Sequence, residues 1–431
     1  MGDGEFALPP GTHTVAMGVG DLNGVMRGKR IPAARWETVR EAGTAMSVAL
    51  FAIDMTSDIW DTPYTNFDTG YQDCHVFPME APRALPWEPG VAFCMARAET
   101  MDHAPVPIDP RNVLLAQVER ARAMGFEASI GVECECHLLD PQTLRPKDLG
   151  IQVYSLDRAA ELEHVLGPIR RQIDAVGIPI EQSNPEYAPG QVEVNVRYAD
   201  ALTSADRMVA FRSLVKQLAM HHGYLATFMA KPFFDESGNG FHVHHSLWRD
   251  GANAFAEAGR LSKTGFAYLA GVQRRMIEAS LCGTMTPNGY RRFQPLSFCP
   301  TNVAWGYDNR TAALRVIEGA DAAVRVESRN GSADANPYLH VAAHLAAGLD
   351  GIEQGLTPEH FAEGNAYLMD EAPKLPTSAE AAVAAAKGSA WLKGVLGDLM
   401  HALMIQQAER EIGFVAAQVT PVEIERYLRN L

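Results

Sequence analysis

Four short segments of this 431-residue chain alternate charged side chains with apolar ones: residues 130–137, 191–197, 242–248 and 324–329. Because successive side chains of a strand point to opposite faces, this alternation predicts strands with one charged and one apolar face. One such strand is typical of a half-exposed sheet whose charged face meets solvent. Solvated faces favour Thr, Lys, Ser and Gln, however, whereas these four faces carry mainly Glu, His and Arg. We therefore expect the four strands to lie side by side and to line one cleft.

The charged faces bring several potential metal ligands into this cleft, and the loop 184–190 adds one more. The candidates are Glu133, Glu135, Glu186, Glu193, His242 and Glu327. Five carboxylates in one cleft repel each other unless cations lie among them. Carboxylate oxygens with a single imidazole suit Mg²⁺ or Mn²⁺ better than a thiolate-bound metal, and six ligands are enough for two ions. The sequence therefore predicts a site for divalent cations.

Five arginines within residues 292–329 add a second clue to the chemistry. They are Arg292, Arg310, Arg315, Arg325 and Arg329. The guanidinium group binds carboxylates and phosphates through two parallel hydrogen bonds. Metal-binding carboxylates beside such arginines are typical of phosphoryl transfer. The chain has no GxxxxGKS/T sequence and no complete GxGxxG sequence, so we expect any nucleotide to be bound by another architecture.

The net charge, the longest apolar run and the cysteines exclude several classes of protein. The formal net charge of −15 argues against partners such as nucleic acid or an anionic membrane surface. The longest apolar run, residues 45–53, has about half of the roughly 20 residues needed to span a bilayer. The first ten residues lack the basic start and apolar core of a signal peptide. Because six cysteines do not make a disulfide scaffold, we expect reduced thiols and a cytoplasmic protein.

A change in composition near residue 105 predicts two domains. Residues 1–105 are rich in Gly, Pro, Asp and aromatic residues and contain one helical candidate, residues 33–41. Asp109 and Pro110 then have the sequence of a helix start, with Asp at the N-cap and Pro at the first helical position. Residues 106–431 mix short strands with helices, which we expect at residues 156–176, 204–222, 261–278 and 336–348.

From about residue 15 to its end, the chain resembles the glutamine synthetase superfamily in a series of motifs that follow the family's order. These motifs are residues 21–29 (DLNGVMRGK), 132–135 (VECE), 186–193 (EYAPGQVE), 226–232 (ATFMAKP), 237–244 (SGNGFHVH), 288–293 (NGYRRF), 308–310 (DNR), 325–329 (RVESR) and 334–338 (DANPY). The resemblance is strongest to the γ-glutamylpolyamine, or γ-glutamylputrescine, synthetase branch, through residues 27–32 (RGKRIP), 51–55 (FAIDM) and 290–295 (YRRFQP).

The resemblance implies an α+β fold with two domains. Residues 1–105 would form a small N-terminal β-grasp domain, and residues 106–431 a catalytic domain with a curved antiparallel sheet backed by helices. Family members form two stacked hexameric rings, so the resemblance implies a homo-oligomer, a dodecamer. Each active site would lie between the first domain of one subunit and the catalytic domain of its neighbour.

The resemblance also implies a role for each candidate residue. One metal ion would be bound by Glu135, Glu186 and Glu193, and the other by Glu133, His242 and Glu327. Substrate glutamate would be held by Arg292 and Arg329, with Gly238 beside its amino-acid end. The phosphate-facing arginines would be Arg310, Arg315 and Arg325, and the nucleotide-side residues His244 and Ser246. A neighbouring subunit would offer Asp54 to the amine, so the residues expected to act on reacting groups are Asp54, Arg310 and Glu327.

The implied reaction uses L-glutamate, ATP and an amine, with Mg²⁺ or Mn²⁺ as the cofactor. The γ-carboxylate of glutamate attacks ATP to form γ-glutamyl phosphate, and an amine then displaces phosphate. Ammonia-using members carry a flap glutamate two positions before a proline, where this chain has Phe298. An aromatic ring packs against an alkyl chain, whereas ammonium needs a polar cage. We therefore infer that the acceptor, which would also contact Phe298, is an organic amine.

Residues 54–73 would border the entrance for this amine, and they combine five aspartates with four aromatic residues. The acids would suit the distal ammonium of a diamine, whereas the rings would suit an alkyl, hydroxyalkyl or aryl monoamine. A solvated loop is the plainer interpretation of the same segment. Three other functions stay open at this point: a glutamine synthetase that uses ammonia, a different metal enzyme on the same scaffold, and a non-catalytic assembly. The complete set of six metal-ligand candidates argues against the last.

Overall fold

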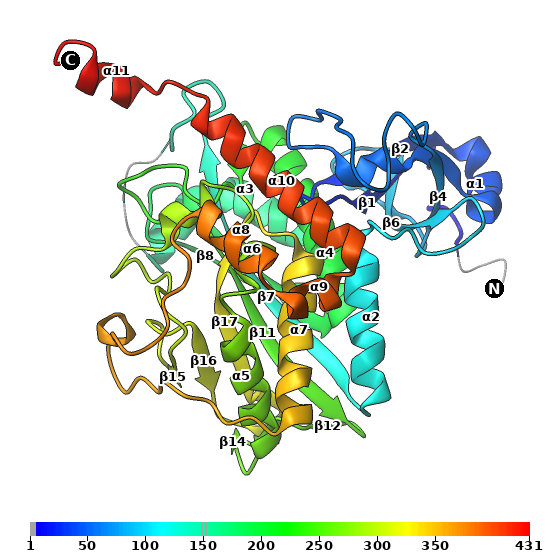
Figure 1. The fold of residues 1–431 in the computed structure, drawn as a ribbon. Coiled ribbons are helices and arrows are strands. Elements are labelled where there is room, and N and C mark those ends of the chain that lie inside the picture. Colours follow the sequence, from blue (N-terminus) through cyan, green and yellow to red (C-terminus); the bar gives the residue numbers. More distant parts are fainter. Residues whose placement is uncertain (1–5, 148–149, 151–152) are drawn as a thin grey trace.

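The computed structural model of the protein describes residues 6–147, 150 and 153–431, which form two main sheets and a short hairpin (Figure 1). The strands of the first sheet are β1 (Thr14–Gly20), β2 (Met26–Pro32), β3 (Thr44–Ser47), β4 (Asp73–Pro78), β5 (Arg83–Ala84) and β6 (Val91–Thr100). Those of the second sheet are β7 (Glu127–Leu139), β8 (Ile180–Pro185), β9 (Gln191–Asp200), β10 (Leu225–Thr227), β11 (Gly240–Arg249), β12 (Ala252–Asn253), β15 (Trp305–Tyr307), β16 (Leu314–Ile317) and β17 (Arg325–Ser332). The hairpin consists of β13 (Ala256–Glu257) and β14 (Arg260–Leu261).

The first sheet is mixed and has the strand order β2-β1-β6-β4-β3, with β5 also paired to β6. Strands β1 and β6 run parallel, and the other pairs are antiparallel. A short 3-10 turn (Ala33–Arg35) leads into α1 (Trp36–Ala42), which agrees with the helix expected at residues 33–41. This helix packs against the sheet through the buried side chains of Trp36 and Val39, because they lie three residues apart on one helical face.

The second sheet has the strand order β15-β16-β17-β11-β7-β9-β8, so the four strands with charged faces are direct neighbours. The prediction that they lie side by side is therefore confirmed. Their other face is apolar and buried: Val132, Cys134 and Cys136 of β7 alternate with the acids of that strand, as do the three valines of β9. All pairs in this sheet are antiparallel except β15 with β16.

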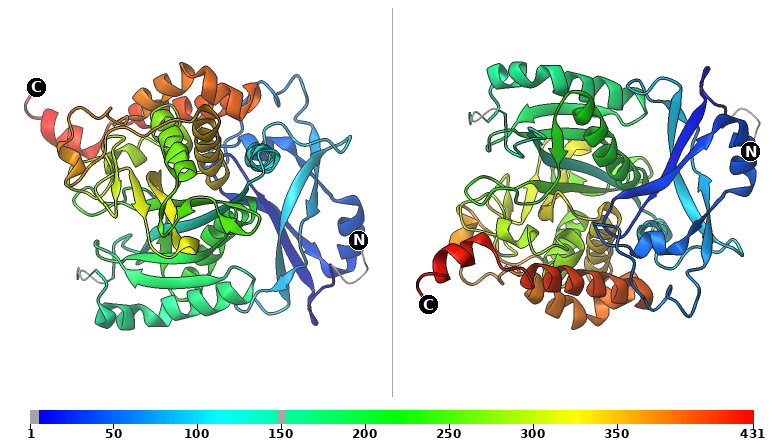
Figure 2. Two further views of the ribbon diagram at one scale, coloured as in Figure 1. Left: turned by 90° about the horizontal axis from the view of Figure 1, so that it is seen from below. Right: turned by 90° about the horizontal axis from the view of Figure 1, so that it is seen from above.

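Helices pack on the apolar side of this sheet and on one another, as the two views of Figure 2 show. They are α2 (Pro110–Ala123), α3 (Leu156–Ala175), α4 (Ala201–His221), α5 (Lys263–Arg275), α6 (Ser280–Gly283), α7 (Pro337–Gln354), α8 (Ala379–Lys387), α9 (Ala390–Leu396) and α10 (Asp398–Ala416). A last helix, α11 (Pro421–Tyr427), follows them in the chain. Helix α2 starts as predicted, since the Asp109 side chain accepts a hydrogen bond from the Arg111 amide. Helix α4 starts three residues before the predicted position because Asp200 caps it, and α7 continues to Gly355, whose left-handed conformation ends it.

The turn between β1 and β2 anchors the first sheet to the part of the chain that contains the second sheet. The Asn336 side chain donates hydrogen bonds to the carbonyls of Asp21 and Leu22, at 3.0 and 2.9 Å, and Arg212 Nη2 donates to the Gly24 carbonyl at 3.0 Å. Gly24 has a φ of +64°, and a Cβ atom there would lie 2.2 Å from Arg212 Nη2. This position therefore requires glycine, and the two domains meet through backbone carbonyls rather than through a loose linker. The boundary near residue 105 stays a prediction.

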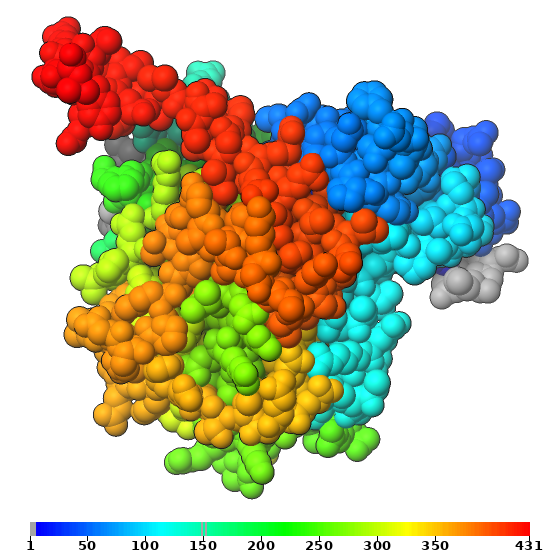
Figure 3. All heavy atoms as spheres, viewed as in Figure 1, coloured from blue at the N-terminus to red at the C-terminus, as the bar shows by residue number. Residues whose placement is uncertain are grey.

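The C-terminal helices lie on the outside of the molecule (Figure 3). Helix α10 contacts the segment that follows β3, because Arg410 pairs with Asp58 at 2.7 Å and Gln406 donates to the Asp61 carbonyl at 2.9 Å. Helix α11 projects from the body and contributes no buried residue. Within the described part of the chain, no helix has the length and apolarity needed to cross a membrane.

Candidate active site

Strand register places the predicted ligands opposite one another on the charged face of the second sheet. Glu133 of β7 lies opposite His242 of β11, and Glu135 lies opposite Glu193 of β9. Glu327 of β17 faces His244 on one side and Arg315 of β16 on the other. Paired residues of neighbouring strands have Cβ atoms about 5 Å apart, so the backbone alone brings these charges together.

Glu327 is the most deeply buried acid of this group, with no exposed surface. Its carboxylate accepts hydrogen bonds from Arg315 Nη1 at 3.0 Å and from Arg329 Nη1, and His242 Nδ1 lies 3.6 Å away. Burial opposes ionisation, but the Arg329 charge and the two neighbouring imidazoles outweigh it and lower the pKa of Glu327 to about 2. Glu327 is therefore a permanent anion that orients two arginines.

Glu133 contacts both histidines of β11. Its Oε2 lies 3.2 Å from His242 Nδ1, and its Oε1 lies 3.0 Å from His244 Nε2. Burial works against the carboxylate here too, but the contacts with the two imidazoles hold the pKa of Glu133 well below its usual range. The predicted ligand set is thus already negative at the positions where a cation would be bound.

Three further carboxylates form the other half of the cluster. Glu135 Oε2 accepts hydrogen bonds from the Gly240 amide at 2.7 Å and from Gln191 Nε2 at 3.1 Å. Glu186 accepts from the Asn184 side chain at 2.8 Å. Burial, reinforced by Glu135, raises the pKa of Glu186 to about 7, and burial reinforced by Glu133 and Glu135 raises the pKa of Glu193 to about 9. These two acids repel their neighbours and would gain from a bound cation.

The donor atoms fit a divalent cation of the Mg²⁺ or Mn²⁺ type, because they are carboxylate oxygens and imidazole nitrogens without thiolates. Donor atoms of Glu133, His244 and Glu327 all lie within 4.8 Å of one another. His244 was expected on the nucleotide side instead, and its Nδ1 accepts a hydrogen bond from Arg325 Nε at 3.1 Å. Arginine only donates, so the proton of neutral His244 is on Nε2, facing Glu133. This tautomer favours His242 as the ligand, an assignment that remains a prediction.

The substrate-side arginines are buried beside the cluster. Arg292 Nη1 donates to the Gly331 carbonyl at 2.8 Å and to Ser332 Oγ at 3.1 Å, and its Nε has no hydrogen-bond partner among the described residues. The Nε of Arg329 likewise has no partner in the described part of the chain. A Cβ atom at Gly238 would lie 2.6 Å from Arg292 Cγ, so Gly238 leaves the space that the Arg292 side chain occupies. Two buried guanidiniums with free donors suit an anionic substrate.

Arg315 lies on β16, and Arg310 lies on the loop before it, at one edge of the cluster. Arg315 Nε donates to Asp308 Oδ1 at 2.9 Å, so Asp308 helps to orient this guanidinium, a role that the sequence analysis missed. Arg310 is exposed. Burial and the Glu186 charge raise the pKa of the Tyr154 phenol, while the Arg310 charge lowers it. Arg310 and Tyr154 therefore both lie near the carboxylates, and Tyr154 is an addition to the predicted site.

A cavity of about 390 Å³ opens next to Glu133 and joins the predicted nucleotide-side residues. Its lining includes His244, Ser246 and Arg325. Trp248 also lines it and donates from Nε1 to Ser246 Oγ at 3.0 Å. Because Trp248 continues the alternation of residues 242, 244 and 246, strand parity was the signal that would have found it. The size is within the range of small-molecule sites.

Two further predicted residues, Asp54 and Phe298, lie on segments outside the strands of the second sheet. Asp54 Oδ1 accepts hydrogen bonds from the amides of Thr56 and Asp58, both at 2.8 Å, and its charged neighbours are Arg410 and Glu411 of α10. Phe298 has a φ of +58° and a ring that is 58% exposed. Neither arrangement tests the role that the resemblance implies for the residue.

The raised pKa values of Glu186 and Glu193 predict how stability and cation binding depend on pH. Both pKa values are ordinary, at 4.5, in the unfolded chain and higher in the folded one. The stability that these protonated acids contribute is therefore present below pH 4.5 and lost as the pH rises through about 7 and 9. A cation that replaces the protons should restore it, by about 3 kcal/mol at a concentration a hundredfold above its Kd.

Thermal unfolding with and without Mn²⁺ between pH 5 and pH 9 measures this effect. The increase in Tm caused by Mn²⁺ should grow with pH and shrink in Glu193→Gln, while Glu119→Gln, an exposed change on α2, should leave it unaltered. Burial also raises the pKa of Asp21 and Asp109, to about 6 and 7, but these groups lie outside the cluster, so only the Mn²⁺-dependent part is diagnostic. A Mn²⁺ effect that is constant from pH 5 to pH 9 would contradict the prediction.

Comparisons with known proteins agree with this fold and site. Residues 107–427 match the family described as the catalytic domain of glutamine synthetase. The γ-glutamylethanolamide synthetase GlnA4 of Streptomyces coelicolor is 37% identical over 436 residues, which cover 97% of this chain and 93% of that protein. The glutamate–isopropylamine ligase of a Pseudomonas species is 34% identical over 392 residues, covering 87% and 85%. The structure of a GmaS–ADP complex superposes with a TM-score of 0.87 at 31% identity and covers 97% of both chains.

The mixed first sheet, the curved antiparallel second sheet and its row of acids thus define an α+β protein of the glutamine synthetase architecture. The chain belongs to the glutamine synthetase family. The predicted fold class is confirmed, and so is the resemblance to the part of the superfamily that forms γ-glutamylamides.

Proposed function

We propose that this protein is an ATP-dependent ligase that joins the γ-carboxylate of L-glutamate to an organic amine. The products are a γ-glutamylamide, ADP and phosphate. The observation that carries the proposal is the buried cluster in which Glu327 holds two arginines beside five other potential metal ligands. The relatives named for isopropylamine and ethanolamine as acceptors support an organic amine over ammonia.

Two divalent cations would be held by the six ligands, one by Glu135, Glu186 and Glu193, and the other by Glu133, His242 and Glu327. When bound, they would neutralise the charge of the phosphate that is transferred. The raised pKa values of Glu186 and Glu193 support the first of these sites, because like charges are gathered there without counter-charges. We propose Mg²⁺ or Mn²⁺ on the chemistry of the donors.

Arg292 and Arg329 would bind the carboxylates of glutamate and orient its γ-carboxylate toward ATP in the neighbouring cavity. A γ-carboxylate oxygen attacks the γ-phosphorus, a new O–P bond forms, and the bond to the β-phosphate oxygen breaks to release ADP. Arg310, Arg315 and Arg325 would donate to the oxygens of the transferred group, where charge is spread. Glu327 fixes Arg315 in place for this role.

In the second step the amine nitrogen attacks the acyl carbon of γ-glutamyl phosphate, and the C–O bond to phosphate breaks. The nitrogen must lose a proton, for which we propose Asp54 of a neighbouring subunit as the acceptor. In the single chain Asp54 lies on the outside of the first domain, which is consistent with an active site shared between subunits. We propose a dodecamer of two stacked hexamers in the cytoplasm, and mass photometry of the purified protein tests this assembly.

An assay of phosphate release tests the proposed reaction. The protein is supplied with L-glutamate, ATP and Mg²⁺, and with isopropylamine, ethanolamine, putrescine or ammonia in parallel. We expect release with at least one organic amine and little with ammonia alone. Release with ammonia only would establish a glutamine synthetase, ADP formation without phosphate would indicate a kinase, and no release with any amine would support a non-catalytic assembly.

Phe298→Glu is expected to shift the acceptor preference toward ammonia. The exposed ring at this position offers an apolar face to an alkyl chain, whereas a carboxylate would stabilise the small ammonium cation. The ratio of kcat/KM for ammonia to that for the preferred organic amine should rise by about tenfold or more. Leu296→Glu is the matched control, because it places the same charge two residues away on the same exposed loop. Equal ratios in the two variants would contradict a role for Phe298 in choosing the acceptor.

A further inference from the structure

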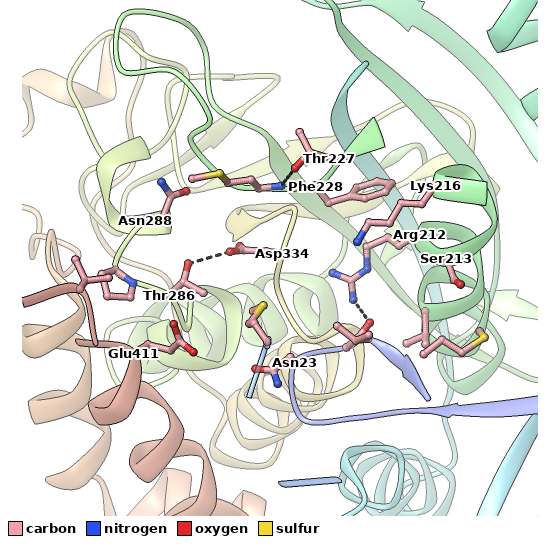
Figure 4. Close-up of a pocket in the computed structure, with 18 residues that line it drawn as sticks. Asn23, Arg212, Ser213, Lys216, Thr227, Phe228, Thr286, Asn288, Asp334 and Glu411 are labelled. Carbon is pink, nitrogen blue, oxygen red and sulfur yellow. Dashed lines mark hydrogen bonds between the residues drawn. The ribbon is translucent and has the colours of Figure 1, made fainter. Parts of the chain in front are cut away.

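A second cavity, of about 420 Å³, lies where the β1–β2 turn meets α4 and the end of α10 (Figure 4). None of the six metal-ligand candidates lines it. Its walls come from residues 23–26 of the first domain, from α4, from residues 227–229 and 286–288, and from α10. The volume is within the range of pockets that bind small molecules.

Positive charge lies on the α4 side of this cavity. Arg212 is buried and donates to three backbone carbonyls, but it has no ion pair among the described residues, and its Nε has no hydrogen-bond partner. Lys216, one helical turn further along α4, forms no hydrogen bond or ion pair in the described part of the chain and lies with Nζ 5.9 Å from the centre of the Phe228 ring. The charges of Asp334 and Asp21 act on Arg212, but neither carboxylate forms an ion pair with it, so an anionic group in the cavity would add to its stabilisation.

Two acidic residues, Asp334 and Glu411, also line this cavity. Asp334 Oδ2 accepts a hydrogen bond from Thr286 at 2.9 Å, while its buried Oδ1 has no partner among the described residues. Glu411 of α10 lines the cavity nearby, and Figure 4 shows both carboxylates on the side away from Lys216. Burial raises the pKa of Asp334 and of Glu411, although the charges of Arg212 and Arg292 act in the opposite direction on Asp334, and that of Arg410 on Glu411.

Opposite charges that line one cavity without forming an ion pair suggest a ligand that carries both signs. Water would satisfy the unpaired atoms, but it would leave the charges uncompensated. The rest of the wall is largely apolar and includes Val25, Val209, Phe228 and Met229. We propose that this cavity binds a small zwitterion, an α-amino acid with a short aliphatic side chain. Its carboxylate would contact Lys216 and Arg212, and its ammonium would contact Asp334 and Glu411.

Such a ligand would contact both domains at once. Arg212 already donates to the Gly24 carbonyl and to the carbonyls of Ala333 and Ala335, on either side of Asp334. The amide oxygen of Asn23, also buried and without a partner in the described residues, faces the same space from the first domain. Occupancy should therefore stabilise the junction between the domains in addition to satisfying these groups.

Calorimetric titration of the full-length protein, treated with EDTA and free of ATP, tests the proposal with three probes of one carbon skeleton. L-Valine should bind at one site per chain. We expect 3-methylbutanoate, which lacks the ammonium, and isobutylamine, which lacks the carboxylate, to bind more weakly by roughly tenfold or more. Lys216→Met and Asp334→Asn should each weaken L-valine binding by roughly tenfold to a hundredfold, whereas Lys263→Met, an exposed lysine on α5, should not change it.

Three results would overturn the proposal: no binding of L-valine up to about 10 mM, binding that neither variant weakens, or equal binding of 3-methylbutanoate and L-valine. Thermal unfolding of each variant confirms that it folds, and Glu411→Gln on the outer helix replaces Asp334→Asn should that variant fail to fold. The outcome is independent of the proposed ligase reaction, because L-valine has no γ-carboxylate and the assay contains no ATP.

Discussion

Glu327→Gln is expected to lower amine-dependent phosphate release by about a hundredfold to a thousandfold. The carboxylate is fully buried and accepts hydrogen bonds from Arg315 and Arg329, so it orients both guanidiniums and supplies one proposed metal ligand. A neutral amide of the same shape has one acceptor oxygen and no charge. The two buried arginines would then lose their counter-charge, which should also lower the free energy of unfolding by roughly 3–5 kcal/mol.

Urea unfolding measures the loss of stability, and the phosphate assay measures the loss of activity. Both are measured at a temperature where the variant is folded, so that lost activity is not lost structure. Glu363→Gln is the control, since Glu363 is an exposed glutamate outside the sheet. A Glu327→Gln protein that keeps more than about half of the activity would refute the role assigned to this acid.

Arg292→Met is expected to raise the KM for L-glutamate by roughly tenfold to a hundredfold while leaving the KM for ATP near its original value. Arg292 is buried beside Gly238, and its Nε has no hydrogen-bond partner among the described residues, which supports its proposed role as a donor to a substrate carboxylate. Methionine keeps most of the stem volume and removes the charge. The selective change in KM is the readout, because a purely structural defect would lower kcat for all substrates together.

The neighbouring arginine supplies a matched control. Arg291 is adjacent in sequence but exposed, so Arg291→Met makes the same chemical change one residue away. Its KM values should remain within about twofold of the original protein. Equal effects of the two substitutions on the KM for glutamate would show that the loop, and not the Arg292 guanidinium, determines glutamate binding.

Strand alternation was sufficient to predict the charged face. Burial of the apolar side chains fixes both which residues of each strand point to the helices and how neighbouring strands are aligned. The apolar residues of β7 and β9 have only one way to face the helices, and that orientation turns Glu133, Glu135 and Glu193 to the other side. Contacts across the face did not follow from parity. Arg325 sets the tautomer of His244 from a different strand, and no periodic pattern in the sequence pairs these two side chains.

Residues on loops were the least predictable from the sequence. Glu186 was a candidate ligand because its loop leads into β9, but its metal site was assigned only through the resemblance, as was the role of Phe298, since an irregular loop has no repeat that fixes where its side chains point. Asp308 and Tyr154 were missed for the same reason. The start of α4 was missed by three residues, because β9 runs three residues beyond the predicted strand 191–197 and its last residue, Asp200, is also the N-cap of the helix.

The contact between residues 58–61 and α10 keeps the segment proposed to receive the amine apart from the groups proposed to activate glutamate. Arg410 and Gln406 hold this segment on the outer side of its own chain, away from the sheet that carries the acids and arginines. If residues 54–73 border the entrance of the amine, as the resemblance implies, a mutant library confined to residues 55–73 would sample new amine acceptors while the groups proposed to activate glutamate stay unchanged. The same contact sets a boundary for such work, because a truncation that removes α10 would release the segment being diversified.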